Sequence, residues 1–313
     1  MVTVETLSSR LSLIDGLDMG MANRTGTYVL HEEEITLIES GPSPSVPNVL
    51  KGLQKLHIAF SDIKYVVVTH IHLDHAGGAG LLLSYLPNAR LVVHPRGAKH
   101  LINPARLIEG SKAVYGSEQF PQLFDPVVPV SKERIIIKED MDTLCIGLDS
   151  TLTFYHTPGH AAHHFSIYDK KSKGIFTGDT LGVYYSELEK ENCHFVLPST
   201  SPSQFNPRDL LKSIERIERL DIDFIYFGHF QASNKPDFVF QQLRQWLPRF
   251  LLAGRAIYKE DKAVEKLQDH LLVLVQKELD RQGISRNHNV YKQIHLDLYL
   301  CSLGIIDFLQ KGQ

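Results

Sequence analysis

The stretch His70-Ile71-His72-Leu73-Asp74-His75 places three imidazoles and one carboxylate within six residues. The chain has 16 histidines among 313 residues, and such a composition rarely groups three of them around an aspartate by chance. Imidazole nitrogens together with a carboxylate oxygen suit borderline divalent metals such as zinc. Four candidate ligands also exceed the three protein ligands of a typical catalytic zinc site. The stretch therefore indicates an enzyme in which two metal ions share one loop.

The residues around this stretch predict an α/β fold. Residues 64–69 form a nearly continuous apolar run, typical of a strand in a sheet covered on both faces, and this run leads directly into the histidine loop. Residues 91–94 have the pattern of the next strand, and residues 95–102 that of a helix behind it. Upstream, residues 26–39 predict a hairpin and residues 48–56 a helix. This alternation favours layers of helices and sheets.

A second strand-rich half follows, and the character of the chain changes near residue 236. The expected strands of this half are residues 134–137, 144–146, 151–156, 164–168, 174–177 and 224–227, with a helix at 209–220. Beyond residue 236 the strand signals stop, and helical periodicity covers residues 238–258, 263–281 and 290–309. We therefore expect a catalytic domain over residues 1–235 and a helical C-terminal extension over residues 236–313.

The composition excludes several classes of protein. Hydrophobic residues make up 43% of the chain and charged residues 22%, and the net charge of −3 gives no sign of a nucleic-acid partner. Cys145, Cys193 and Cys301 are isolated, which excludes a disulfide framework and a thiolate zinc site. No run reaches the roughly 20 apolar residues of a membrane span, and no secretory signal is visible. We expect a cytoplasmic protein without a membrane partner.

Three further candidate ligands stand at predicted strand ends beside glycine. His160 follows Thr157-Pro158-Gly159, Asp179 lies in Thr177-Gly178-Asp179-Thr180, and His229 ends Tyr226-Phe227-Gly228-His229. Active-site residues gather where strands give way to loops, because the sheet positions them while the loops leave room for substrate. These positions extend the candidate metal site beyond the first loop.

These four motifs in this order resemble those of the metallo-β-lactamase superfamily, over roughly residues 10–235. The resemblance implies a four-layer αββα sandwich and a complete dinuclear site. Its first metal would be held by His70, His72 and His160. Its second metal would be held by Asp74, His75 and His229, with Asp179 as the bridging carboxylate. Zinc is the expected metal, although the same ligands accept iron or manganese.

The resemblance also implies a hydrolase. A hydroxide bridging two metals is a nucleophile at neutral pH, and Asp74 would orient it and pass a proton toward the leaving group. Glu39 stands where the family usually has an aspartate that braces the metal loop, so we predict a bracing role for it.

The expected substrate is a small molecule with a carboxylic ester, thioester or lactone. Two alternatives remain open: a phosphodiesterase or nuclease, and a persulfide dioxygenase with a single iron. The helical extension could cap the pocket or mediate a homodimer.

Several residues near the motifs allow two interpretations. His163 and His164 are either ordinary polar residues at a strand start, which we favour, or contacts of the metal site or substrate. Tyr184 and Tyr185 could stabilise an oxyanion, as in related lactonases, or form an aromatic wall. The Pro- and Ser-rich residues 195–205 could be a substrate lid or a plain connector.

Overall fold

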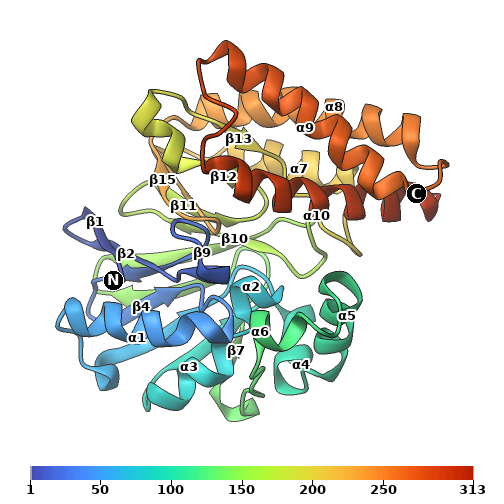
Figure 1. Ribbon diagram of the computed structural model, residues 1–313. Helices are drawn as coiled ribbons and strands as arrows, with labels where there is room; N and C mark the ends of the chain where they lie inside the picture. Colours follow the sequence, from blue (N-terminus) through green and yellow to red (C-terminus); the bar gives the residue numbers. More distant parts are fainter. Residues whose placement is uncertain (1, 313) are drawn as a thin grey trace. The chain divides into compact units, whose positions relative to one another are not determined.

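The structure is a computed structural model that describes residues 2–312 (Figure 1), and these residues form two compact units. The first unit comprises Met1–His156, His163–Gly178 and Asp221–Asn234. The second comprises Thr157–Ala162, Asp179–Leu220 and Lys235–Gln313. The two units alternate along the chain, and the predicted boundary after residue 235 stays a prediction.

A seven-stranded mixed sheet begins the first unit. Its strands, in spatial and chain order, are β1 (Val4–Ser8), β2 (Leu11–Asp15), β3 (Gly26–Leu30), β4 (Ile35–Ile38), β5 (Ile63–Val67), β6 (Arg90–Val93) and β7 (Ile135–Ile137). The first four strands pair antiparallel, whereas β4 to β7 pair parallel. Because β4 and β5 are parallel, the residues that follow them emerge at the same edge of the sheet.

A six-stranded mixed sheet completes the first unit. Its order is β15 (Ala232–Ser233), β14 (Phe224–Phe227), β11 (Gly174–Gly178), β10 (Phe165–Asp169), β9 (Ser150–His156) and β8 (Thr143–Gly147). Only β11 and β14 pair parallel. Their carboxyl ends therefore lie side by side, and they lead into Asp179 and His229 respectively.

Two apolar clusters hold the first unit together. The cluster between the sheets joins Val67 and Val92 of the first sheet to Phe154, Ile167 and Phe176 of the second, all almost fully buried. The other cluster packs the opposite face of the first sheet against helices. These helices are α1 (Val46–Lys55), α3 (Ala79–Tyr85) and α4 (Pro95–Ile102) (Figure 1). A sheet covered on both faces explains why β5 is apolar at nearly every position.

The first unit contains three further α-helices. They are α2 (Leu73–Ala76), α5 (Ala105–Tyr115) and α6 (Phe120–Phe124). The stretch His70–His75 begins after β5 and runs into α2, which contains Asp74 and His75, so the sheet and a helix hold its two ends.

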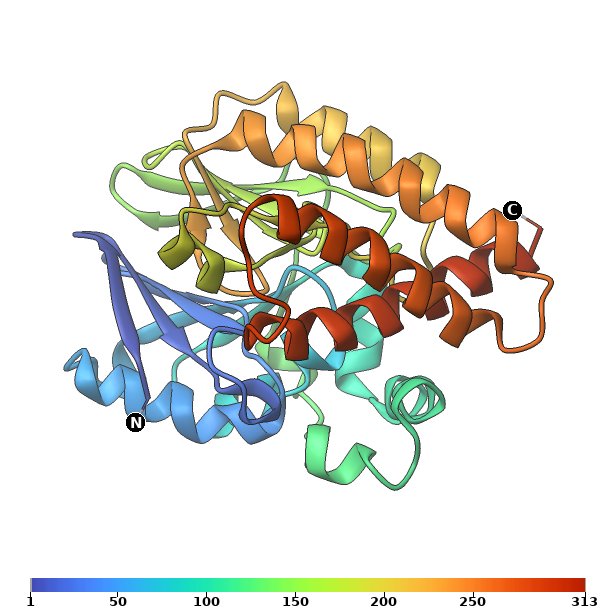
Figure 2. The ribbon, with the colours of Figure 1, turned by 45° about the horizontal axis from the view of Figure 1, so that its top comes forward.

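The second unit is mostly helical. It contains α7 (Pro207–Glu218), α8 (Pro236–Ile257), α9 (Ala263–Arg281), α10 (Val290–Gln310) and the small sheet of β12 (Val183–Tyr184) and β13 (Val196–Leu197). Figure 2 shows α8, α9 and α10 running alongside one another, in agreement with the contacts among all three. Among residues 2–312, none of the helices combines the length and apolar character needed to cross a bilayer.

Most of the predicted elements are confirmed, with ends that agree or differ by at most two residues. The β3–β4 hairpin, α1, the β5 and β6 strands and the three C-terminal helices all form where they were expected. The prediction did not include β1, β2, α2, α5, α6 or the two-residue strands, and it placed residues 73–75 in a loop. None of the α5 residues is fully buried, so this helix has no strong apolar stripe to detect.

Candidate metal centre

The first unit brings together five of the seven predicted ligands. His70, His72, Asp74 and His75 follow β5, and His229 follows β14. His70, His75 and His229 are almost fully buried, at 4% exposed or less. Burying several imidazoles and a carboxylate together is unfavourable unless something compensates them, so the cluster itself calls for a ligand.

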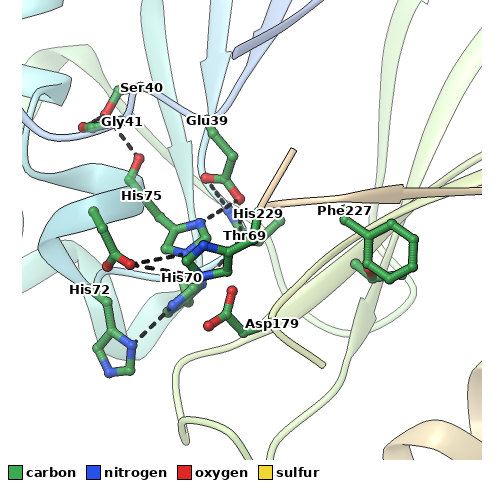
Figure 3. Close-up of polar contacts among 12 residues, drawn as sticks. Glu39, Ser40, Gly41, Thr69, His70, His72, His75, Asp179, Phe227 and His229 are labelled. Atoms are coloured by element: carbon green, nitrogen blue, oxygen red, sulfur yellow. Dashed lines mark hydrogen bonds and ion pairs between the residues drawn. The ribbon is translucent and has the colours of Figure 1, made fainter. Parts of the chain in front are cut away.

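One group of donor atoms surrounds His70. A nitrogen of His70, a nitrogen of His75 and an oxygen of Glu39 all lie within 4.8 Å of one another. His70 Nε2 also lies 3.1 Å from His72 Nδ1 (Figure 3). Two imidazole nitrogens that face each other at this distance can share one proton or bind one cation.

A second group of donor atoms surrounds Asp74. Donor atoms of Asp74, His75 and His229 also lie within 4.8 Å of one another. Asp74 Oδ2 is 3.7 Å from His75 Nε2 and 3.8 Å from His229 Nε2. One carboxylate oxygen thus faces two imidazole nitrogens, a donor set that suits zinc, iron or manganese.

The other ring nitrogen of these histidines meets an acceptor of the protein. His75 Nδ1 lies 3.4 Å from Glu39 Oε1, and His229 Nδ1 lies 3.3 Å from the carbonyl oxygen of Arg24. Carboxylates and carbonyls only accept, so in the neutral ring Nδ1 carries the proton and Nε2 keeps its lone pair. Metal-binding histidines are typically oriented in this way.

Glu39 also braces His70 through Thr69. The Thr69 hydroxyl donates a short hydrogen bond to Glu39 Oε1, and the Thr69 backbone N–H donates to Glu39 Oε2 at 3.3 Å. Because its proton is given to Glu39, the Thr69 oxygen accepts from His70 Nδ1 at 3.0 Å. Figure 3 shows Glu39, Thr69, His70 and His75 together. The longer glutamate therefore reaches the metal loop, as predicted.

The second unit brings together the other two predicted ligands. His160 Nε2 lies 3.5 Å from Asp179 Oδ2, and both side chains are nearly buried. His160 Nδ1 lies 3.3 Å from the carbonyl oxygen of Ser199, and the Ser199 hydroxyl donates to Asp179 Oδ2 at 2.9 Å. The imidazole orientation is thus the same as in the first unit, with Nε2 turned toward a carboxylate. The donors and supports of the first unit fit a divalent metal ion, and the second unit holds two more donors of the same kinds.

Some supporting residues escape prediction from sequence. Arg24 and Ser199 act on histidines through backbone carbonyls, which every residue type has, so no motif marks them. Arg24 also forms a buried ion pair with Asp18, with its Nε 3.2 Å from Asp18 Oδ2. Burial raises the pKa of Asp18 to about 6, and the nearby Arg24 guanidinium opposes that rise.

His163 and His164 immediately precede β10, and their ring contacts favour the alternative interpretation, in which they contact the predicted ligands. His164 is fully buried and its ring stacks on that of His70, with centroids 4.8 Å apart, and the His163 and His72 centroids are 5.5 Å apart. Gly178 explains the close fit, since a β-carbon there would overlap Thr69 Oγ1 and crowd the His164 ring.

Tyr184 and Tyr185 contribute to polar contacts inside the second unit. The Tyr184 hydroxyl hydrogen-bonds Glu189 and lies 2.9 Å from His194 Nδ1. The Tyr185 hydroxyl donates to Asp297 Oδ2 of α10 at 3.0 Å. Both rings are about 1% exposed, and these contacts support the aromatic-wall interpretation over an oxyanion role.

A known protein with a solved structure resembles this chain in fold and in sequence. The crystal structure of ST1585, an archaeal metallo-beta-lactamase superfamily protein from Sulfolobus tokodaii, matches 97% of this chain and 99% of its own, with a TM-score of 0.67 and 21% identity. In sequence, ST1585 (there ascribed to Sulfurisphaera tokodaii) is 26% identical over 227 residues, covering 71% of this chain and 78% of its own. The predicted αββα fold class with a helical C-terminal extension is confirmed.

Two relatives with higher local identity carry names of enzymes. Hydroxyacylglutathione hydrolase of Tolumonas auensis is 30% identical over 141 residues, covering 45% of this chain and 41% of its own. N-acyl homoserine lactonase AttM of Azorhizobium caulinodans is 32% identical over 115 residues, covering 37% of this chain and 39% of its own.

A family model that matches most of the chain shows to which family the chain belongs. The model of the metallo-beta-lactamase superfamily covers residues 23–229, which include every predicted ligand. The chain belongs to the metallo-beta-lactamase superfamily.

Proposed function

We propose that the chain is a dinuclear metal-dependent hydrolase of a small carboxylic ester, thioester or lactone. The proposed centre uses the seven ligands that the family pattern assigns: His70, His72, Asp74, His75, His160, Asp179 and His229. Zinc is the proposed metal at both positions. The names of the hydroxyacylglutathione hydrolase and the lactonase support an acyl substrate.

The observation that carries the proposal is the common orientation of the histidines. His75, His160 and His229 each present Nδ1 to a carboxylate or carbonyl acceptor and turn Nε2 toward an aspartate oxygen. With the proton on Nδ1, each Nε2 turns a lone pair toward a carboxylate oxygen, which is unfavourable unless a metal ion or a further proton lies between the two atoms.

Asp74 is the proposed catalytic residue. Two divalent ions, when bound, lower the pKa of a water molecule toward 7 and polarise the substrate carbonyl. The Asp74 carboxylate accepts the proton of the attacking water and returns it to the leaving oxygen or sulfur. Its side chain remains 13% exposed, unlike the buried histidines around it, so water can reach it. A group in this role typically contributes 10²- to 10⁴-fold to the rate.

The test is hydrolysis by metal-stripped protein that has been reloaded with zinc, manganese or iron. The substrates are an acyl thioester, an acyl homoserine lactone, a nitrophenyl ester and bis(nitrophenyl) phosphate, with Asp74→Asn as the matched variant. We expect turnover of at least one acyl substrate, reduced about 10²- to 10⁴-fold by Asp74→Asn.

The alternatives give different results in the same assay. Turnover of the phosphodiester alone would replace the proposal with a phosphodiesterase. Oxygen uptake with a persulfide by the iron-loaded protein, without acyl hydrolysis, would replace it with a dioxygenase.

A further inference from the structure

We propose that helix α10 positions two of the metal ligands, His160 and Asp179, through the segment Pro198 to Ser201, with Ser199 as the positioning residue. This inference rests on the proposed function, and it gives the C-terminal extension a role in metal binding. All the contacts that carry it lie within the second unit.

Ser199 is the link between the two ligands. Its carbonyl oxygen faces His160 Nδ1 at 3.3 Å, and its hydroxyl donates to Asp179 Oδ2 at 2.9 Å. The first contact keeps the proton on Nδ1, so that Nε2 keeps the lone pair that a ligand needs. The Ser201 hydroxyl also lies 3.3 Å from Nε2, and it can donate to that lone pair. The second holds the carboxylate whose same oxygen lies 3.5 Å from His160 Nε2. One residue therefore sets both the tautomer of the imidazole and the position of the carboxylate.

The segment that contains Ser199 is attached to α10 on both sides of that residue. The Thr200 hydroxyl donates to the Cys301 carbonyl at 3.0 Å, and the Cys301 thiol donates to the Pro198 carbonyl at 3.3 Å. Burial raises the pKa of Cys301 to about 12, so the thiol stays protonated and remains a donor at neutral pH. These two hydrogen bonds leave Ser199 little freedom to move away from the helix.

A glycine lets the helix and the segment approach this closely. A β-carbon at Gly304 would overlap the carbonyl oxygen of Thr200, so only glycine fits at this point of α10. Cys301 and Gly304 are three residues apart and lie on the same face of the helix. Further along this face, the rings of Phe308 and Phe205 pack with centroids 5.8 Å apart.

The segment is therefore an ordered part of the ligand support. Residues 195–200 are all buried, which argues against a lid in this part of the predicted 195–205 loop. Lys311, which directly follows α10, adds a contact, because its Nζ donates to the Ser203 carbonyl at 3.0 Å. A displacement of α10 would move Ser199, and with it the atoms that hold His160 and Asp179.

The test compares Ser199→Ala with Ser199→Thr in the full chain. Zinc affinity is measured by competition with a chromophoric chelator, and thermal unfolding is measured on the metal-free protein. We expect Ser199→Ala to weaken zinc binding about 10- to 100-fold, as loss of a supporting hydrogen bond to a ligand does elsewhere. Ser199→Thr keeps the hydroxyl and restores most of the affinity. We expect the metal-free wild-type protein and both variants to unfold at the same temperature. If Ser199 served only to stabilise the fold, metal-free Ser199→Ala would unfold at a lower temperature.

A second pair of variants tests the helix itself. Gly304→Ala pushes α10 away from Thr200 and should weaken zinc binding at least as much as Ser199→Ala. Gly110→Ala is the matched control, because this glycine also lies within a helix and its β-carbon would meet nothing within 4 Å. We expect it to leave zinc affinity unchanged.

The outcomes separate this inference from the proposed function. If the wild-type chain binds zinc and Ser199→Ala binds it equally tightly, the inference is wrong and the proposed function stands. If the wild-type chain binds no metal, both are wrong. If Gly304→Ala does not fold, the Ser199 pair alone decides the question.

Discussion

The two units of the molecule orient their candidate metal ligands in the same way but support them differently. In the first unit the supports are Glu39, at the end of β4, and the Arg24 carbonyl, in the loop between β2 and β3. In the second unit the support is Ser199, in an irregular segment held by α10. Each ring needs an acceptor for its Nδ1 proton. In one unit the acceptor lies at a strand end or in a loop between strands, and in the other it lies in a segment bound to a helix.

This difference explains where changes far from the ligands should act. In the first unit the support belongs to the sandwich, so it persists as long as the sheets remain folded. In the second unit the support depends on a contact between a helix and a loop, which can shift without unfolding the sheets. The Ser199 and Gly304 variants test the support in the second unit, and the substitutions that follow test the first unit.

The largest effect is expected from the buried Asp18–Arg24 pair in the first unit. Both side chains are about 1% exposed, so Arg24→Met leaves Asp18 buried without its counter-charge. Removing one partner of a buried pair typically costs 3–5 kcal/mol, and we expect a fall of about that size in the free energy of unfolding. Urea denaturation of the metal-free protein measures it. Asp18→Asn combined with Arg24→Met should recover most of the lost free energy of unfolding. A double variant that is as unstable as Arg24→Met alone would show that the unpaired Asp18 charge is not the cause.

The cost of Arg24→Met should also depend on pH. The pKa of Asp18 in the folded protein, about 6, lies above its ordinary value near 3.8 because the carboxyl is buried. Protonation therefore favours folding, so this group's contribution to stability is complete below about pH 4 and is lost as the pH rises through 6. We expect the variant to differ least from the wild-type protein near pH 4 and most near pH 7.

A smaller effect is expected from Glu39, the sheet-borne support. Glu39→Gln keeps the size of the side chain but removes the charge that faces His75 Nδ1 and accepts from Thr69. We expect zinc affinity to fall about 10- to 100-fold, measured by chelator competition. Glu39→Asp keeps the charge and should recover part of the affinity. Equal zinc affinities of the wild-type protein and both variants would show that Glu39 does not support the ligands.

The smallest effect concerns His94, a first-unit histidine that is not a predicted ligand. His94 Nδ1 accepts a hydrogen bond from the Arg96 N–H at the start of α4, the reverse of the Nδ1 role in His75 and His229. We therefore expect His94→Asn, which can still accept this bond, to leave the metal content unchanged. Loss of metal in this variant would show that the role of Nδ1 does not distinguish ligand histidines from other buried histidines.

The same substitution should alter the response of stability to pH. Burial, and then the neighbouring His156, lowers the pKa of His94 to about 4. The unfolded chain therefore binds the proton more readily, and this group costs stability as the pH falls from 6.5 to 4. Between pH 6.5 and 4, the free energy of unfolding of the metal-free wild-type protein should fall by up to about 2 kcal/mol relative to that of His94→Asn. This value allows for partial screening of the imidazole charge by solvent.

The sequence predicted the parts of the fold whose pattern is local. The apolar run of β5, the β3–β4 hairpin and the periodic helices α8, α9 and α10 were all expected from spacing alone. Helix α5 was not, because it lacks a buried stripe, and β12 and β13 are too short to show a period. Helix α7 starts at Pro207, two residues before the predicted start, where the Asn206 side chain caps its first turn.

The candidate site shows the same division between local and long-range information. The predicted ligand residues lie in short motifs, so they could be proposed from sequence, whereas their supports could not. Ser199 and Arg24 act through carbonyl oxygens, and Gly304 acts through a contact with a segment about 100 residues away. Such contacts depend on tertiary packing, which a residue pattern does not record. The stacking of His164 on His70 was missed for this reason.

The most direct test of the central claim is the metal content of the tag-free chain, measured by plasma mass spectrometry after growth in metal-replete medium. His75→Ala removes a ligand of the first unit, His160→Ala removes one of the second, and His94→Asn is the control. If the centre is dinuclear, the wild-type protein and the control contain two divalent ions per chain, and both ligand variants lose metal. The absence of stoichiometric metal, or two ions retained in either ligand variant, would contradict the central claim.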